Sequence, residues 1–180
     1  MPEKLDFITP TFMTVFEFFL EDPAQEHHER EVVRGAGVSK GSANKILRRL
    51  AEMDFLIRET KGRMVFYRLN AREPAVRQFK ALANVYMLKG LVDRLKQHSK
   101  KILMFGSCAR GVDVKGSDVD LFILSSEKAL VKRIVSDFNQ RSERKIAPII
   151  VDSNELVQLR REDEPLYENI ERGIVLWETE

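Results

Sequence analysis

The chain has 180 residues, 43% of them hydrophobic and 32% charged, which is enough for one or two small domains with a buried core. Its 30 basic and 28 acidic residues nearly cancel, and this balance excludes the low hydrophobicity and high net charge of a disordered chain. One cysteine excludes an internal disulfide framework, no apolar run approaches the roughly 20 residues of a membrane span, and the acidic start MPEKLDFITP lacks a signal-peptide core, so we expect a soluble, cytoplasmic protein with no membrane partner.

Charge is unevenly distributed along the chain. Residues 1–29 have one basic and seven acidic side chains, a net charge of −6, whereas residues 30–80 have thirteen basic and five acidic ones, a net charge of +8. Residues 101–180, with twelve basic and fifteen acidic side chains, return to −3. A basic block between acidic ones favours a polyanion as the partner of residues 30–80. A solvated basic surface without a partner is the alternative that charge alone leaves open.

Three helices are predicted before residue 55. Apolar residues first follow the i, i+3, i+4, i+7 and i+8 spacing of one helix face, at Phe12, Val15, Phe16, Phe19 and Leu20. Asp22-Pro23 ends this helix, and a second, short helix is expected at about residues 28–34. A turn at residues 35–38, which contains two glycines, leads into a third helix with Ser39 as its N-cap.

The third helix combines a buried stripe with a polar, basic surface. The stripe consists of Ala43, Ile46, Leu47 and Leu50. Hydroxyl and amide side chains can read base edges in a groove of DNA, while lysines contact the phosphates. The predicted DNA-contacting residues of this helix are Ser39, Lys40, Ser42, Asn44 and Lys45.

A basic β-hairpin follows. Residues 55–59 and 64–69 are its predicted strands, and the turn between them carries Lys61 and Arg63, which we expect to contact phosphates. Helix, turn, helix and hairpin in this order resemble the winged helix-turn-helix domains of small prokaryotic transcription regulators, over residues 10–70. The resemblance implies a DNA-binding homodimer that reads two half-sites. Because winged helices also dock proteins, a protein-docking module is the alternative.

A long helix is predicted over residues 72–98. Its apolar residues at helical spacing are Val76, Phe79, Leu82, Ala83, Tyr86, Met87, Leu91 and Leu95. Such a helix between two domains could be a spacer or a dimerisation element, or it could simply pack against the second domain.

The second half contains a turn suited to phosphate and two paired carboxylates. An apolar strand at residues 101–105 leads into Gly106-Ser107, and ten residues separate Ser107 from Asp118. Glycine lets the backbone approach a phosphate, serine adds a hydroxyl, and a following helix adds free amides. Asp118 and Asp120 stand at i and i+2 of another strand, so both carboxylates leave the same face. Two such carboxylates repel each other unless a cation lies between them, and Mg²⁺ prefers oxygen ligands of this kind.

The combination of these elements, MFGSCARGVDVKGSDVDLFIL, resembles the small "minimal" members of the nucleotidyltransferase superfamily typified by DNA polymerase beta, over about residues 99–178. The resemblance implies that Gly106 and Ser107 hold the phosphates of a nucleoside triphosphate, expected to be ATP, and that Asp118 and Asp120 hold Mg²⁺ or Mn²⁺. Arg110 would pair with a phosphate, although an exposed structural arginine is the equal alternative.

One departure from the family concerns the third carboxylate, which active members usually carry on a later strand. The corresponding strand here has apolar Ala147 and Ile149 where we expect the acid. Asp152 is the candidate left, at the end of this strand, where it could equally be the N-cap of the next helix. We favour the cap, with the consequence that nucleotide binding survives while transfer is slow or lost.

The sequence therefore predicts an α+β protein: a winged helix-turn-helix domain at residues 1–72, a connecting helix at 73–98 and a minimal nucleotidyltransferase domain with a small mixed sheet at 99–180. The resemblance implies Mg-dependent transfer of a nucleotidyl group, AMP from ATP, to a hydroxyl of a partner protein or small molecule, as in an antitoxin or regulator. The alternative is a transcription regulator whose second domain is degenerate and serves only nucleotide sensing or assembly.

Overall fold

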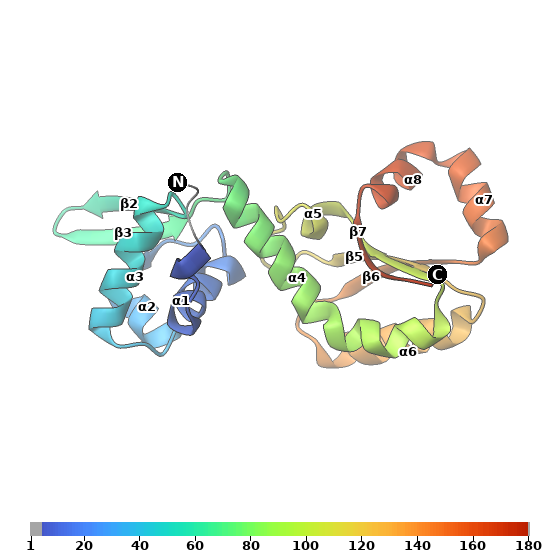
Figure 1. The fold of residues 1–180 in the computed structure, drawn as a ribbon, viewed down its shortest axis with the longest axis horizontal. Coiled ribbons are helices and arrows are strands. Elements are labelled where there is room, and N and C mark those ends of the chain that lie inside the picture. Colours follow the sequence, from blue (N-terminus) through green and yellow to red (C-terminus); the bar gives the residue numbers. More distant parts are fainter. Residues whose placement is uncertain (1–4, 180) are drawn as a thin grey trace. The chain divides into compact units, whose positions relative to one another are not determined.

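The structure, a computed structural model, describes residues 5–179 and has the mixed α+β architecture predicted (Figure 1). The chain divides into two compact units, which meet in the sequence between Val76 and Arg77. Within the described residues the first unit has a three-stranded sheet of order β1-β3-β2, and the second a four-stranded sheet of order β6-β5-β4-β7.

Three helices supply most of the buried residues of the first unit, and the hairpin strands supply others. A 3₁₀ turn at Leu5–Phe7 precedes helix α1 (Pro10–Glu21), and α2 (Glu29–Gly35) and α3 (Lys40–Glu52) follow. Helix α1 begins at Pro10, where the Thr9 hydroxyl accepts a hydrogen bond from the Phe12 amide and proline occupies the first turn. All five residues of its predicted stripe are buried.

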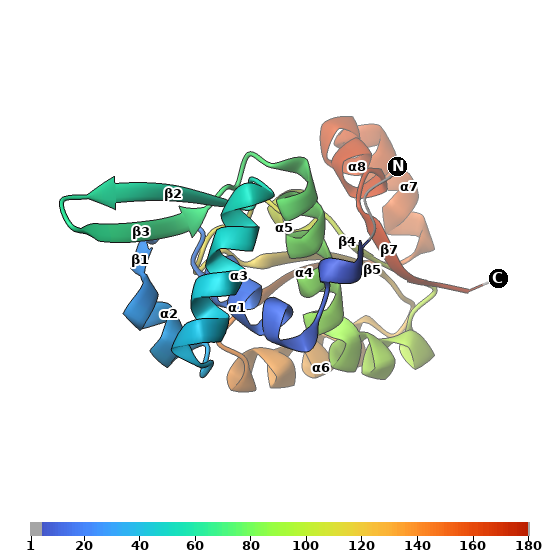
Figure 2. The ribbon, with the colours of Figure 1, turned by 60° about the vertical axis from the view of Figure 1, so that its left-hand side comes forward.

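The predicted hairpin is present: its second strand has the predicted bounds, and its first strand begins one residue later and ends two residues later than expected. β2 (Leu56–Lys61) and β3 (Met64–Leu69) pair as far as Lys61 and Met64, which leaves Gly62-Arg63 as a two-residue turn (Figure 2). Gly62 has φ +61, a conformation that glycine adopts without strain. On the other side of β3 lies β1 (His27–His28), a two-residue strand that the sequence analysis did not foresee. The three helices and the hairpin follow one another along the chain in the predicted order.

The long helix, α4 (Pro74–Leu95), ends in a 3₁₀ turn at Lys96–His98. Leu88, Leu91 and Leu95 lie in the core of the second unit, so most of α4 packs there, as one of the predicted alternatives has it. The helix is present as predicted, but its apolar residues do not all face the core: Leu82 and Tyr86 are 59% and 76% exposed, while Lys80 and Asn84 are buried.

The sheet of the second unit lies between two pairs of helices (Figures 1 and 2). β4 pairs antiparallel with β5 on one side and with β7 on the other, whereas β5 and β6 run parallel and are connected through α6. The elements in chain order are β4 (Lys101–Met104), α5 (Gly106–Ala109), β5 (Val119–Leu124), α6 (Lys128–Arg141), β6 (Ile146–Val151), α7 (Ser153–Glu162), α8 (Glu164–Glu171) and β7 (Ile174–Glu178).

Alternating side chains of β5 cover the two faces of this sheet. Val119, Leu121 and Ile123 pack with α4 and α6, and Phe122 packs on the face covered by α7 and α8. Asp120 alternates onto the same face as Phe122, at the end of the strand where β4 turns into α5. No helix of residues 5–179 is long and apolar enough to cross a membrane.

Candidate functional site

The turn after β4 lies directly against the second carboxylate of β5. The Phe105 amide donates a hydrogen bond to the Asp120 carbonyl (3.1 Å), and Gly106 has φ +70. A Cβ atom at Gly106 would lie 2.2 Å from Asp120 Oδ2, so no larger residue fits between the turn and the carboxylate. The structure thus places the backbone of Gly106 directly against the Asp120 carboxylate.

Asp118 and Asp120 differ in their surroundings. Asp118 is exposed just before β5, whereas Asp120 is half-buried inside the strand. Burial, and then the charge of Asp118, raise the pKa of the Asp120 carboxyl above its usual value. A cation held by both carboxylates would remove this penalty. No group of three or more histidine, cysteine or acidic side chains suited to a metal occurs in residues 5–179, but two carboxylates fit Mg²⁺, which keeps water or phosphate oxygens as its other ligands.

Asp152 is not part of this pair. The parallel register places Ala147 beside Asp120, and Asp152 follows the other end of β6, about 16 Å further along at the usual strand rise. There Asp152 caps α7 by accepting hydrogen bonds from the amides of Asn154 (2.9 Å) and Glu155 (3.0 Å). These bonds, the Glu155 amide first, lower the pKa of the Asp152 carboxyl. The cap interpretation is confirmed, and the structure does not bring a third carboxylate to Asp118 and Asp120 through this residue.

Arg110 and Ser107 lie at the two ends of the short helix α5. Arg110 is its C-cap residue and is exposed, and its guanidinium makes no hydrogen bond or ion pair with residues 5–179. Ser107 is half-buried, and its carbonyl accepts the Val112 amide (3.1 Å). The Arg110 side chain therefore remains available to a ligand at the turn, whereas the Ser107 side chain hydrogen-bonds Cys108.

A buried polar cluster beneath the turn escaped the sequence analysis. It consists of Lys80 and Asn84 from α4, Cys108 from α5, Asp113 from the following loop and Arg144 from the loop before β6. Its members are far apart in the sequence and form no motif. The one local signal was a lysine and an asparagine four residues apart in a largely apolar helix.

Comparison with known proteins addresses the second unit. Residues 86–171 match the nucleotidyltransferase domain family. The match covers slightly less than half of the chain and includes the turn, both aspartates and Asp152. From here we call the unit that contains it the nucleotidyltransferase-like unit. No curated protein matches the chain.

Solved structures give weaker similarities. A protein from Sulfolobus solfataricus assigned as a nucleotidyltransferase is 16% identical, with 58% of this chain and 88% of that chain covered and a TM-score of 0.39. A toxin-antitoxin structure with AMP-PNP is 20% identical, with coverages of 54% and 75% and a TM-score of 0.38. A protein from Methanosarcina mazei assigned as a transcriptional regulator is 16% identical, with coverages of 51% and 76% and a TM-score of 0.36.

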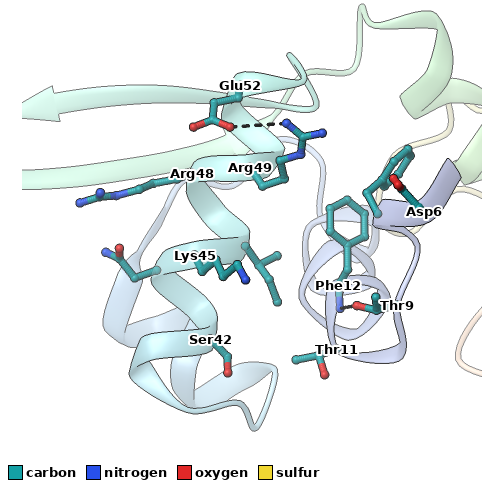
Figure 3. Close-up of a pocket in the computed structure, with 12 residues that line it drawn as sticks. Asp6, Thr9, Thr11, Phe12, Ser42, Lys45, Arg48, Arg49 and Glu52 are labelled. Atoms are coloured by element: carbon teal, nitrogen blue, oxygen red, sulfur yellow. Dashed lines mark hydrogen bonds and ion pairs between the residues drawn. The ribbon is translucent and has the colours of Figure 1, made fainter. Parts of the chain in front are cut away.

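Outside the nucleotidyltransferase-like unit, the predicted DNA-contacting residues of α3 fall into two groups. Lys45 is exposed and, with Ser42, lines an open groove of about 730 Å³ between α3 and the start of α1 (Figure 3). Lys40 is exposed as well. Ser39 instead caps α3 by accepting the Ser42 amide (3.2 Å), and the Asn44 amide donates to Glu29 Oε2 (2.8 Å).

At the hairpin tip, too, one predicted phosphate-contacting residue is already engaged in contacts within the protein and the other is not. Lys61 forms an ion pair with Glu26 (2.5 Å) and lies over the Phe66 ring, 5.5 Å from its centroid. Arg63, in the turn, is exposed and has no hydrogen-bond or ion-pair partner in the described chain. Of the predicted DNA-contacting residues, three cations can therefore bind a phosphate without first losing a contact within the described chain: Lys40, Lys45 and Arg63.

Proposed function

We propose that the chain binds a magnesium–nucleoside triphosphate at the Gly106 turn and transfers a nucleotidyl group, AMP from ATP, to a hydroxyl of a partner protein or small molecule. The observation that carries this proposal is the contact of the Gly106 backbone with the Asp120 carboxylate, next to Asp118. Both halves of the motif thereby meet at one end of the sheet, within the residues that match the nucleotidyltransferase family.

Each residue then has a defined task. Asp118 and Asp120 hold the metal ion, Mg²⁺ or Mn²⁺, which supplies positive charge against the phosphate oxygens. Gly106 lets the triphosphate approach the backbone, the Ser107 hydroxyl donates to a phosphate oxygen, and Arg110 pairs with phosphate charge. The acceptor oxygen forms a bond to the α-phosphorus as the bond to pyrophosphate breaks, and its proton leaves to water or to a base on the acceptor.

A second candidate function is nucleotide sensing without transfer. It is favoured by the apolar residue Ala147 beside Asp120, where a third carboxylate would activate the acceptor, and by the capping role of Asp152. In this case the chain is a regulator whose second domain binds nucleotide only.

For the first unit we propose DNA binding by a homodimer through α3 and the hairpin tip. Support comes from the net positive charge of residues 30–80 and from the exposure of Lys40, Lys45 and Arg63. Protein docking is the alternative use of the same surface. An antitoxin or regulator that modifies a partner protein would combine both units.

Titration calorimetry with Mg-ATP tests the nucleotide site. We expect metal-dependent binding by the wild type and its loss in Asp118→Asn/Asp120→Asn, with Asp137→Asn, a half-exposed aspartate of α6 that pairs with Arg94 (3.7 Å), as the control. Pyrophosphate release in the presence of cell extract, as a source of acceptor, would favour transfer over sensing. No binding of ATP or any other nucleoside triphosphate by the wild type would overturn both candidate functions.

Fluorescence anisotropy with mixed duplex DNA tests the first unit. The triple variant Lys40→Ala/Lys45→Ala/Arg63→Ala should lose about tenfold or more in affinity and reduce the slope of affinity against salt, whereas Lys132→Ala/Arg133→Ala on α6 should do neither. Equal affinity of the triple variant and the wild type would favour protein docking.

A further inference from the structure

The turn that carries Gly106 and Ser107 rests on one face of α4. Gly111, at the end of the turn, has φ +63, and a Cβ atom there would lie 1.9 Å from the Arg77 carbonyl oxygen. One helical turn further along α4 is Lys80, and one more turn leads to Asn84, both about 95% buried. The backbone of α4 and two of its polar side chains thus form the floor under residues 108–113.

Both α4 side chains bind the loop that connects the turn to β5. The Lys80 ammonium donates to the Asp113 carbonyl oxygen and lies 3.5 Å from Asp113 Oδ2. The Asn84 amide donates to the Cys108 carbonyl (3.1 Å) and to Asp113 Oδ1 (3.0 Å). Asp113 is therefore held from two successive turns of the helix, and its exposed fraction is only 4%.

Arg144 closes the cluster from the other side. Its guanidinium donates to Asn84 Oδ1 (2.7 Å), to Asp113 Oδ2 (3.0 Å) and to Cys108 Sγ (3.2 Å). The next residue, Lys145, accepts the Val119 amide through its carbonyl (2.8 Å), at the start of β5. The Cys108 thiol in turn donates to the Asp118 carbonyl (Sγ to O, 3.6 Å). The cluster is thereby connected to both parts of the site, the turn and the strand with the two aspartates.

Such a buried charged cluster contributes little net free energy to the stability of a fold. Burying charged groups costs solvation free energy, and apolar residues of similar volume often stabilise a protein as well or better. Burial lowers the pKa of Lys80, which is the expected sign of that cost. Directed hydrogen bonds achieve what apolar packing does not, since they fix the position and orientation of the loop that they hold.

We propose that Lys80, Asn84, Asp113 and Arg144, which we call the α4 clamp, are positioning residues that hold the Gly106–Gly111 turn at the distance from Asp118 and Asp120 that a magnesium–triphosphate requires. The proposal rests on the proposed function of that site. The clamp touches no nucleotide. It acts by keeping the turn and the carboxylates in register, and displacement of a binding group by about 1 Å can cost up to about 100-fold.

Cys108 provides a direct readout because it is the single cysteine of the chain and is fully buried under Arg144. A thiol reagent that releases a coloured thiolate on disulfide exchange therefore reports how often the turn opens. We expect slow labelling of the wild type, slower labelling with Mg-ATP, and labelling at least about tenfold faster in Arg144→Met, in the folded protein. Arg144→Lys, which keeps one donor, should lie between them.

Mg-ATP affinity is measured on the same proteins by calorimetry. Arg144→Met should bind at least about tenfold more weakly than the wild type, and Arg141→Met, an exposed arginine at the end of α6, should bind and label like the wild type. Circular dichroism confirms that each variant is folded. If Arg144→Met fails to fold, Asp113→Asn, which keeps the side-chain volume and removes the charge, takes its place.

The outcomes separate this inference from the function on which it rests. Faster labelling and weaker binding, both partly restored in Arg144→Lys, support the clamp. Wild-type binding of Mg-ATP with unchanged labelling and affinity in the clamp variants would overturn the clamp and leave the proposed function intact. Absence of nucleotide binding by the wild type would overturn both.

Discussion

Aspartates lie at both ends of the parallel pair β5 and β6, and their surroundings shift the pKa of the carboxyl group in opposite directions at the two ends. At one end Asp120 is half-buried against the Gly106 turn and near the charge of Asp118, and the pKa of its carboxyl is raised. At the other end Asp152 accepts two backbone amides at the start of α7, and the pKa of its carboxyl is lowered. The ionised form of Asp152 is thus stabilised by its own backbone contacts, whereas the ionised form of Asp120 would be stabilised by a bound cation.

Substitution of Gly106 should have the largest effect, because it directly disturbs the contact between the Gly106 turn and Asp120. Gly106→Ala puts a Cβ atom within 2.2 Å of Asp120 Oδ2 at φ +70, so either the turn or the carboxylate must move. We expect Mg-ATP affinity, measured by calorimetry, to fall by about 100-fold or more. Gly116→Ala is the matched control, since it has φ +82 and no atom within 4 Å of the added Cβ.

Gly116→Ala shares the backbone strain without the collision. It should lower the melting temperature somewhat and leave the affinity for Mg-ATP within about twofold of wild type. If both alanine variants bind Mg-ATP alike, the contact between Gly106 and Asp120 has no part in the site.

Replacement of Asp120 by the isosteric asparagine is predicted to have the next largest effect, with the same replacement of Asp152 as the comparison. Asp120→Asn should weaken metal-dependent Mg-ATP binding by about tenfold or more, because a neutral amide is a poor ligand for Mg²⁺. Asp152→Asn should leave binding within about twofold and lower the melting temperature, because the ion pair with Lys128 (3.6 Å) is lost and the cap weakened. Weak binding by Asp152→Asn in the folded protein would restore Asp152 as a site residue.

Features that depend on neighbouring residues in the sequence were predicted well. The α1 stripe, the Ser39 cap and the strands around Gly106 and Asp120 follow from periodicity and residue type within a few positions, and all are present. The β1 strand was missed because its two residues become a strand only through pairing with Phe66 and Tyr67 of β3.

The buried face of α4 shows a different limit. Leu82 and Tyr86 follow the helical spacing of the apolar residues yet are exposed, and the buried face also carries Lys80 and Asn84. Their burial depends on Asp113 and Arg144, which are brought to α4 only by the fold of the second unit. No spacing within the helix reveals partners that lie so far along the chain.

The smallest predicted effect is the pH dependence of stability, which the two carboxyl groups should change in opposite directions. The raised pKa of Asp120 means that the native state holds its proton to higher pH than the unfolded chain, whose aspartates titrate near 3.8. Native stability from this group is therefore present below 3.8 and lost as the pH rises through the native value. The lowered pKa of Asp152 has the reverse effect, with stability present above 3.8 and lost as the pH falls through the native value.

Thermal melting of the wild type, Asp120→Asn and Asp152→Asn from about pH 3 to about pH 7 measures this difference. Relative to wild type, Asp120→Asn should gain stability as the pH rises, and Asp152→Asn should lose it. Mg²⁺ added at about pH 7 should raise the melting temperature of the wild type more than that of Asp120→Asn, because the ion relieves a charge that only the wild type carries there. Parallel pH profiles for the two variants would show that the surroundings of Asp120 and Asp152 do not separate their roles, and the assignment of Asp120 to a cation would lose its electrostatic basis.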